Sequence, residues 1–552
     1  MRHLQIVFGG NRGSTAQHPI RVGNLFNGGY LANMDSSTPP YSGTKESRPT
    51  SNGSLSVEKP EGDMNGSASP NPSSAPIFTV ESAASRKEKM AADETAANGE
   101  YNPHENRIVD HPTTNMETLF HLLKGSLGTG ILAMPLAFMH SGYILGIIGT
   151  IIIGLICTYC VHLLVKSQYE LCRKRRVASL NYPETAEEAL REGPPFMRAC
   201  APYAGHIVNT FLLVYQLGTC CVYIVFVSSN LKDVMDYYVN PLELRVYMVI
   251  LLLPFILINW VRNLKLLAPF STVANFITMV GFGITLFYVL APASLGDHKG
   301  LPSIDSLQAV GNIADMPLFL GTVLFALEAI GVIMPLENNM KTPKSFGGPF
   351  GVLNWSMSLI ITLYVALGFF GYLKYGAGTL DSITLNLPHE QILAQCVKIM
   401  LAFSIFITYG LQAYVADDIA WNIYLAPRME KNSHKILWEY AVRTGLVLIT
   451  FLLAVAIPSI SLFISLFGAL CLSALGIVFP AIIQTATFWN GKVVHGLPAV
   501  EDGVSADSNS YSWPRWKKIR MIVKNSLLII FGLLGLVIGT YTSVSNIIAE
   551  FS

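Results

Sequence analysis

From about residue 113 to its end, the chain alternates between long apolar stretches and short polar clusters. A transmembrane helix needs about 20 predominantly apolar residues, and these stretches reach or approach that length. The predicted spans are 116–139, 142–165, 204–228, 245–260, 268–291, 314–336, 350–373, 393–415, 437–457, 461–487 and 522–549. This pattern predicts an all-α polytopic membrane protein with about eleven transmembrane helices.

The beginning of the chain has a different composition. It is rich in Ser, Asn, Gly and Pro and has little hydrophobic periodicity. Such a segment buries too little apolar surface to offset the entropy lost on folding. We therefore predict a disordered N-terminal tail over residues 1–112 and a transmembrane domain over residues 113–552.

Lysine and arginine are distributed unevenly among the predicted loops. The even-numbered loops carry Arg173, Lys174, Arg175, Arg176, Arg262, Lys265, Lys341, Lys344, Arg428, Lys431, Lys435, Arg515, Lys517, Lys518 and Arg520. The odd-numbered loops hold Lys232, Arg245, Lys299 and little else. Because positive charge is concentrated on the cytosolic side of membrane proteins, the even-numbered loops and the N-terminal tail are predicted to be cytosolic, and the C-terminus outer or lumenal.

Composition narrows the class of function. Charged residues are 13% of the chain, against about 25% in soluble proteins, and the net charge of +1 gives no reason to expect nucleic acid as a partner. Cys157 and Cys160 form a C-x-x-C inside an apolar run, where packing is the expected role. The sequence has no His-Glu-x-x-His motif and no convincing nucleophile–base pair, so we predict neither an enzyme nor a bound metal or cofactor.

The first span contains a cluster of glycines, in Gly125-Ser126-Leu127-Gly128-Thr129-Gly130. Each glycine inside a helix is about 1 kcal/mol less favourable than alanine, so the cluster predicts a helix that stops and restarts. The freed backbone groups cannot face lipid and must line a cavity, where half-helix ends can hold a charged solute. The alternative is that these glycines serve close helix packing.

The sixth span has a matching irregularity five spans later, as an inverted five-plus-five repeat requires. Its interior holds Phe325, Glu328, Ala329 and Gly331. An ionisable residue there costs about 2.5–3.5 kcal/mol on insertion and is by default a functional candidate. Glu328 could instead be a buried acid bonded to a neighbouring helix. The two irregular spans together are predicted to form the substrate site.

A coupling ion can be sought near these breaks. His121 lies one helical turn before the first break, and its pKa near neutrality suits reversible protonation, although a lone membrane histidine is more often a packing residue. Glu328 is a second candidate proton site. Coupling to Na⁺ would need oxygen ligands, which Ser126 and either Ser404 or Thr408 could supply. For Asp417 and Asp418, at the end of the eighth span, solvated or capping roles are predicted.

Four motifs resemble the proton-coupled amino acid transporters, solute carrier family 36, within the amino acid/auxin permease superfamily. They are HLLKGSLGTGILAMP (121–135), QLGTCCVY (216–223), GVIMPLENNM (331–340) and SITLNLP (382–388). The resemblance covers roughly residues 112–552. It implies a LeuT-type five-plus-five fold with one extra helix, a cytosolic N-terminus, and symport of small neutral amino acids with protons into the cytosol.

The resemblance also implies roles for individual residues. His121 matches the family's proton-linked histidine, Gly125 to Gly130 match its unwound segment, and Phe325 to Gly331 the segment facing it. Ser126 departs from the family's common Asn and Ala329 from its common Gly, which affects ion contacts and substrate range. Members lie in the plasma membrane or on lysosomes and endosomes, where some act in nutrient signalling. In this chain, the N-terminal tail would be the segment that binds nutrient-signalling partners. The rival interpretations are a Na⁺-coupled transporter of the same fold and an amino acid sensor with little flux.

Overall fold

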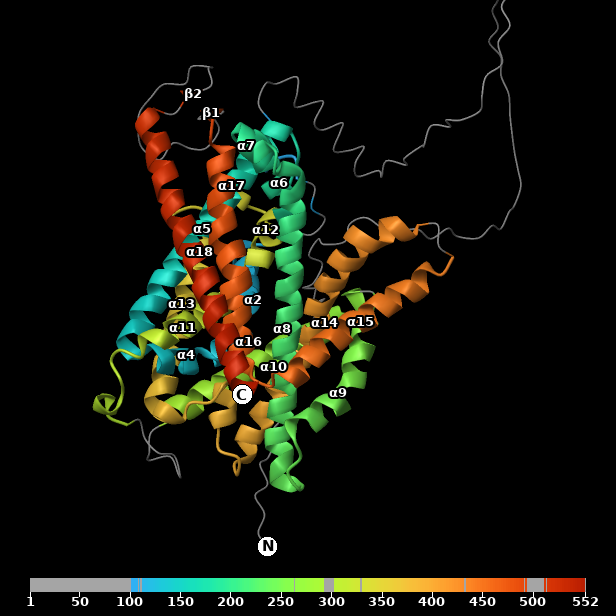
Figure 1. Cartoon of the computed structure of the whole chain (residues 1–552), viewed down its shortest axis with the longest axis vertical. Helices are drawn as coiled ribbons and strands as arrows, with labels where there is room; N and C mark the ends of the chain where they lie inside the picture. Colours follow the sequence, from blue (N-terminus) through green and yellow to red (C-terminus); the bar gives the residue numbers. More distant parts are fainter. Residues whose placement is uncertain are drawn as a thin grey trace, which may run out of the picture. The chain divides into compact units, whose positions relative to one another are not determined.

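Most of the described chain is helical (Figure 1). The computed structural model describes residues 101–107, 109, 112–262, 264–291, 302–327, 330–430, 433–490, 492–493, 511–512 and 514–551. All of these except Tyr101 belong to one of the two units into which the chain divides. The predicted tail therefore lies mostly outside the described residues, and its disorder stays a prediction.

The helices follow the predicted spans closely. The α-helices are α2 (Asn115–Ser126), α3 (Thr129–Leu132), α4 (Met134–Ser141), α5 (Tyr143–Arg175), α6 (Tyr182–Glu192), α7 (Pro195–Arg198), α8 (Ala201–Tyr238), α9 (Leu244–Asn259), α10 (Leu264–Leu290), α11 (Met316–Ala326), α12 (Ile330–Asn338), α13 (Val352–Tyr375), α14 (Ile392–Asp417), α15 (Lys435–Ala456), α16 (Ile460–Phe467), α17 (Phe479–Thr487) and α18 (Arg515–Phe551). Each predicted span coincides with one of these helices or with consecutive ones.

Shorter elements complete the described chain. The 3₁₀ turns are η1 (Ile304–Ser306), η2 (Ile313–Asp315), η3 (Pro343–Ser345), η4 (Gly376–Gly378), η5 (Ile383–Asn386) and η7 (Ala426–Met429), and the π-helices are η6 (Asp418–Leu425) and η8 (Gly468–Val478). Two short strands, β1 (Lys492–Val493) and β2 (Tyr511–Ser512), pair antiparallel between α17 and α18. The η8 π-helix joins α16 to α17 without a gap, so that this span is continuous.

Eight helical segments among the described residues are long and apolar enough to cross a membrane. They are Tyr143–Arg175, Ala201–Tyr238, Pro269–Leu290, Val352–Gly378, Ile392–Met429, Lys435–Ala456, Ile460–Thr487 and Arg515–Glu550. Leu244–Asn259 and Ile313–Ala326 are apolar but shorter. The prediction of an all-α polytopic membrane protein is confirmed, and the count of eleven spans stays a prediction.

Two short helices, α6 and α7, were not predicted. Both lie in the loop after α5, and α6 is too short and too polar to be found by a search for membrane spans. Its N-terminus has a capping box, in which the Asn181 side chain accepts from Glu184 N and the Glu184 carboxylate accepts from Asn181 N, each at 2.9 Å. α6 packs against α8 and α17 and so fixes the loop between the second and third spans.

Packing brings the sixth span against the tenth. α11 contacts α16 and η8, and α18 runs beside the same two elements (Figure 1). The backbones of α11 and α16 touch: a Cβ atom on Gly321 would lie 2.3 Å from Ser465 O. Only glycine permits this approach, since small residues let membrane helices come together. The contact holds α11 in place just before the break in the sixth span.

Candidate functional site

The first span is interrupted, as predicted, but over fewer residues. α2 ends at Ser126, where Leu127 N still donates to Leu123 O at 2.8 Å. Gly128 is extended, with φ −111° and ψ −150°, and α3 starts at Thr129. The break is therefore Leu127 and Gly128, not the whole stretch 125–130. The predicted site residue Gly125 lies inside α2 and is exposed, because the helical hydrogen bonding continues past it.

The sixth span is interrupted at the corresponding place. α11 ends at Ala326, and α12 begins at Ile330. Glu328 and Ala329 lie outside the described residues, so their predicted roles stay predictions. Phe325, the remaining candidate of this span, is buried, and its ring centroid is 5.9 Å from that of Tyr215 on α8.

The two breaks lie against each other. A Cβ atom on Gly130 would be 2.7 Å from the Cα of Ala326, so the chain after the first break touches the end of α11 backbone to backbone. Gly130 thus serves close packing. Gly128 differs, because a Cβ atom there would meet only the Tyr223 hydroxyl of α8, at 3.8 Å. Gly128, the residue before α3, therefore has room for a methyl group, whereas Gly130, inside α3, does not.

Tyr364 of α13 joins the two breaks. Its hydroxyl forms hydrogen bonds with Ser126 O and, at 2.7 Å, with Ala326 O, and its side chain is fully buried. Sequence analysis missed Tyr364, because a single tyrosine in an apolar span carries no signal of its own. Its two acceptors lie 238 and 38 residues away in the chain.

Two hydroxyls at the first break are buried without a protein partner. Ser126 Oγ and Thr129 Oγ1 form no hydrogen bond with any described residue, although their side chains are 4% and 3% exposed. Most buried polar atoms in native structures have at least one partner, so such a pair indicates a place for a polar ligand. With Gly128 and Tyr223, they define the candidate site.

His121 lies on α2 and is partly buried, five residues before Ser126. At a rise of about 1.5 Å per residue, that is about 7.5 Å along the helix from Ser126, the last residue before the break. The structure places it on the right element, and its role in proton coupling stays a prediction.

The hydroxyls named for a Na⁺ site have other partners. Ser404 Oγ lies 2.8 Å from Ala274 O and 2.5 Å from Thr278 Oγ1, both on α10, and Thr408 Oγ1 donates to Ser404 O at 2.9 Å. The Ser404 bonds hold α14 to α10 and the Thr408 bond lies within α14, so they give no support to the Na⁺ alternative.

Asp417 corrects the sequence analysis. It is not solvated: its side chain is 1% exposed, and Arg443 Nη1 of α15 lies 3.1 Å from Oδ2. Arg443 also donates to Asn259 O at 2.9 Å, and it pairs with Glu439 at 3.3 Å. A cavity of about 10 Å³, room for roughly one water molecule, lies beside Asp417 and Asn259. This cluster fastens α9, α14 and α15 together.

Asp418, its neighbour, is half-buried and accepts a hydrogen bond from Asn422 at 2.6 Å. The Asn422 amide belongs to the η6 π-helix, which starts at Asp418. This bond joins two side chains and caps no backbone N–H group, so the solvated or capping role of Asp418 stays a prediction.

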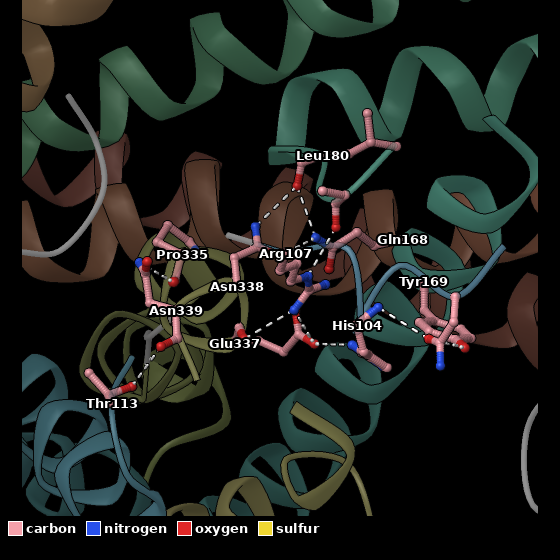
Figure 2. A network of polar contacts seen from close by, with 12 residues as sticks. His104, Arg107, Thr113, Gln168, Tyr169, Leu180, Pro335, Glu337, Asn338 and Asn339 are labelled. Carbon is pink, nitrogen blue, oxygen red and sulfur yellow. Dashed lines mark hydrogen bonds and ion pairs between the residues drawn. The ribbon is translucent and has the colours of Figure 1, made fainter. Parts of the chain in front are cut away.

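A second polar network lies where the chain enters the first span (Figure 2). Arg107 Nη1 is 3.0 Å from the Glu337 carboxylate of α12 and 3.2 Å from Glu337 O, while Arg107 Nε donates to Ala178 O at 3.0 Å. His104 stacks on Tyr169 of α5, with ring centroids 4.5 Å apart. We call His104, Arg107 and Glu337 the entry clasp. It ties the segment before α2 to the ends of α5 and α12.

The charge state of the entry clasp follows from burial. Burial, and then the positive charge of Arg107, lower the pKa of His104 to about 4, so the imidazole is neutral near pH 7. Next to the clasp, Thr113 N donates to Asn339 O at 2.8 Å, and Lys341 N donates to Thr113 O at 2.9 Å (Figure 2). Residues 104–107, which the sequence assigns to the tail, therefore hold the end of the sixth span.

Comparisons with known proteins show which family the chain belongs to. A family model described as transmembrane amino acid transporter protein matches residues 111–496. The chain is 40% identical over 465 residues to the proton-coupled amino acid transporter-like protein pathetic of Drosophila melanogaster, covering 84% of this chain and 92% of that protein. It is 25% identical over 445 residues to the probable amino acid transporter skat-1 of Caenorhabditis elegans, covering 80% and 91%.

Among solved structures, a manganese transporter of Eremococcus coleocola matches with 11% identity and a TM-score of 0.42, covering 79% of this chain and 91% of that one. The family match and the pathetic relative confirm the resemblance to proton-coupled amino acid transporters of the amino acid/auxin permease superfamily. The chain is an integral membrane protein that belongs to the transmembrane amino acid transporter family.

Proposed function

We propose that the protein is a secondary active transporter that moves small neutral amino acids, together with protons, into the cytosol. The observation that carries this proposal is the break at Leu127 and Gly128, with the buried hydroxyls of Ser126 and Thr129 on either side, neither of which bonds to a described residue. Within a membrane, backbone N–H and C=O groups outside a helix must be buried in protein or line a cavity, and transporters use such breaks to hold a polar solute. Family membership makes that solute an amino acid.

The break offers a partner to each end of an amino acid. The first N–H groups of the chain after Gly128 have no acceptor within a helix, and they suit a carboxylate. Carbonyl oxygens end α2 and α11, and helix C-termini attract cations such as an ammonium group. Both ends of the substrate thus have complementary groups within one small region.

The side chains around the two helix breaks favour small neutral substrates. The described side chains at the two breaks, those of Ser126, Thr129, Tyr223, Phe325 and Tyr364, carry no charge to pair with an acidic or basic substrate side chain. The contact between Gly130 and Ala326 leaves little volume on that side. The two features favour amino acids with small, uncharged side chains.

Proton coupling is proposed through His121, with Glu328 as the second candidate. The name of the Drosophila relative, which states proton coupling, supports this choice. The uneven distribution of Lys and Arg favours a cytosolic N-terminus. We place the protein in the plasma membrane or in the lysosomal or endosomal membrane, with the tail available to nutrient-signalling partners.

Uptake into proteoliposomes tests the proposal. Purified protein is reconstituted and given a panel of labelled amino acids, with either a pH gradient or a Na⁺ gradient imposed. The proposal predicts uptake of glycine, alanine or proline that an acidic exterior stimulates and that persists when choline replaces Na⁺. Uptake that requires Na⁺ at constant pH would refute the proton assignment, and no uptake under either gradient would refute the transport function.

A further inference from the structure

We propose that Tyr364 closes the two helix breaks of the empty transporter and is therefore a positioning residue for the step in which the unloaded carrier returns. This inference rests on the proposed function. It assigns no substrate contact to Tyr364, whose hydroxyl acts through the two carbonyl groups that it joins.

The geometry is specific. α13 packs against α2, α3 and α4, and it presents the Tyr364 hydroxyl to one carbonyl from each break, Ser126 O and Ala326 O. The Tyr364 side chain has no exposed surface. A single buried donor thus links the last residue of α2 to the last residue of α11.

One hydroxyl carries one hydrogen, so it can make one strong donor bond at a time. Ser126 O has a second donor, since Gly128 N lies 2.9 Å from it across the break. When the Tyr364 hydrogen turns toward Ala326 O, Ser126 O thus keeps a partner. In the described part of the sixth-span break, no backbone N–H group donates to Ala326 O in this way. The donor to Ala326 O is the Tyr364 hydroxyl.

These carbonyl groups need a donor at every stage of transport, because an unpaired buried carbonyl is costly. In the loaded carrier, the ammonium group of an amino acid has several hydrogens and can serve both oxygens. In the empty carrier, the Tyr364 hydroxyl is the buried donor within reach of both. Loss of this hydroxyl should therefore penalise the empty carrier more than the loaded one.

Measurements of net uptake and of exchange report separately on the empty and the loaded carrier. Net uptake requires the empty carrier to return after each delivery, whereas exchange of labelled for unlabelled amino acid uses the loaded carrier in both directions. Tyr364→Phe removes only the hydroxyl. We expect it to slow net uptake about tenfold, the effect of losing roughly one hydrogen bond to a buried carbonyl, and to change exchange by less than about twofold.

A matched control is available in α14. Tyr409 is also buried, at 1% exposure, and its hydroxyl bonds to Thr450 of α15, far along the chain from both breaks. Tyr409→Phe therefore removes an equally buried hydroxyl outside the proposed linkage. It should leave the ratio of exchange to net uptake at the wild-type value.

The experiment compares wild type, Tyr364→Phe and Tyr409→Phe in proteoliposomes, empty or preloaded with unlabelled amino acid. The ratio of exchange to net uptake does not depend on how much protein folds. A ratio raised about tenfold in Tyr364→Phe alone supports the inference. An unchanged ratio, or the same rise in Tyr409→Phe, overturns it while leaving the proposed function intact. Absence of both activities in the wild type overturns the proposed function as well.

Discussion

Gly128 and Gly130 lie two residues apart, yet the structure predicts opposite consequences for replacing them. A methyl group on Gly130 would come within 2.7 Å of the Ala326 Cα, a backbone atom that cannot rotate away. The two helices must then separate, and overpacking of this kind costs about 1–3 kcal/mol. A methyl group on Gly128 would sit 3.8 Å from the Tyr223 hydroxyl, an ordinary contact. Gly130→Ala should therefore destabilise the protein, whereas Gly128→Ala should not.

Amino acid binding should also distinguish the two glycines, and here Gly128 is the sensitive position. Gly128→Val adds a branched side chain beside the Tyr223 hydroxyl, where the substrate carboxylate is proposed to approach, so it should abolish amino acid binding at near-normal stability. The assay measures thermal unfolding in detergent and amino acid binding on the same purified samples. If Gly130→Ala unfolds at the wild-type temperature, the close packing of the breaks is wrong. If Gly128→Val binds amino acid normally, the site lies elsewhere.

Three further predictions concern the buried charges. Arg107→Ala leaves Glu337 buried without its guanidinium partner and should lower the free energy of unfolding by about 3–5 kcal/mol in chemical denaturation, with Arg107→Met plus Glu337→Gln recovering much of the loss. Asp417→Leu should destabilise to a similar extent, and adding Arg443→Leu should restore stability; a double variant as unstable as the single one would contradict the pairing. The pKa of His104 is lowered to about 4 in the folded chain, so below about pH 6.5 the unfolded chain binds a proton that the folded chain does not. Thermal stability should therefore fall between pH 7 and pH 5, and His104→Gln should remove this fall.

Hydropathy and glycine spacing predicted the architecture because both depend on local properties of the chain. The length of each apolar run decides whether a span exists, and glycines weaken a helix wherever they cluster. The exact extent of the first break could not be predicted as well from the sequence. Gly125 alone does not interrupt α2, because its neighbours keep their helical hydrogen bonds, and the break appears only where Gly128 becomes extended.

The sequence could not reveal contacts between distant residues. Asp417 was expected to meet solvent because it ends a span, but its partner Arg443 lies on the next helix and encloses it. Tyr364 could not be identified from the sequence, because its role depends on hydrogen bonds to two carbonyl groups that lie far from it in the chain. The entry clasp was missed for the same reason, as Arg107 lies 230 residues from the Glu337 carbonyl that it contacts.

The central claim is that the break at Leu127 and Gly128 carries an amino acid together with a proton. The most direct measurement uses proteoliposomes that contain a trapped pH-sensitive dye and no Na⁺. Adding alanine outside should acidify the interior of wild-type vesicles in step with uptake of the label, and it should do neither with Gly128→Val. Uptake of alanine without acidification, or acidification that survives in Gly128→Val, would contradict the account.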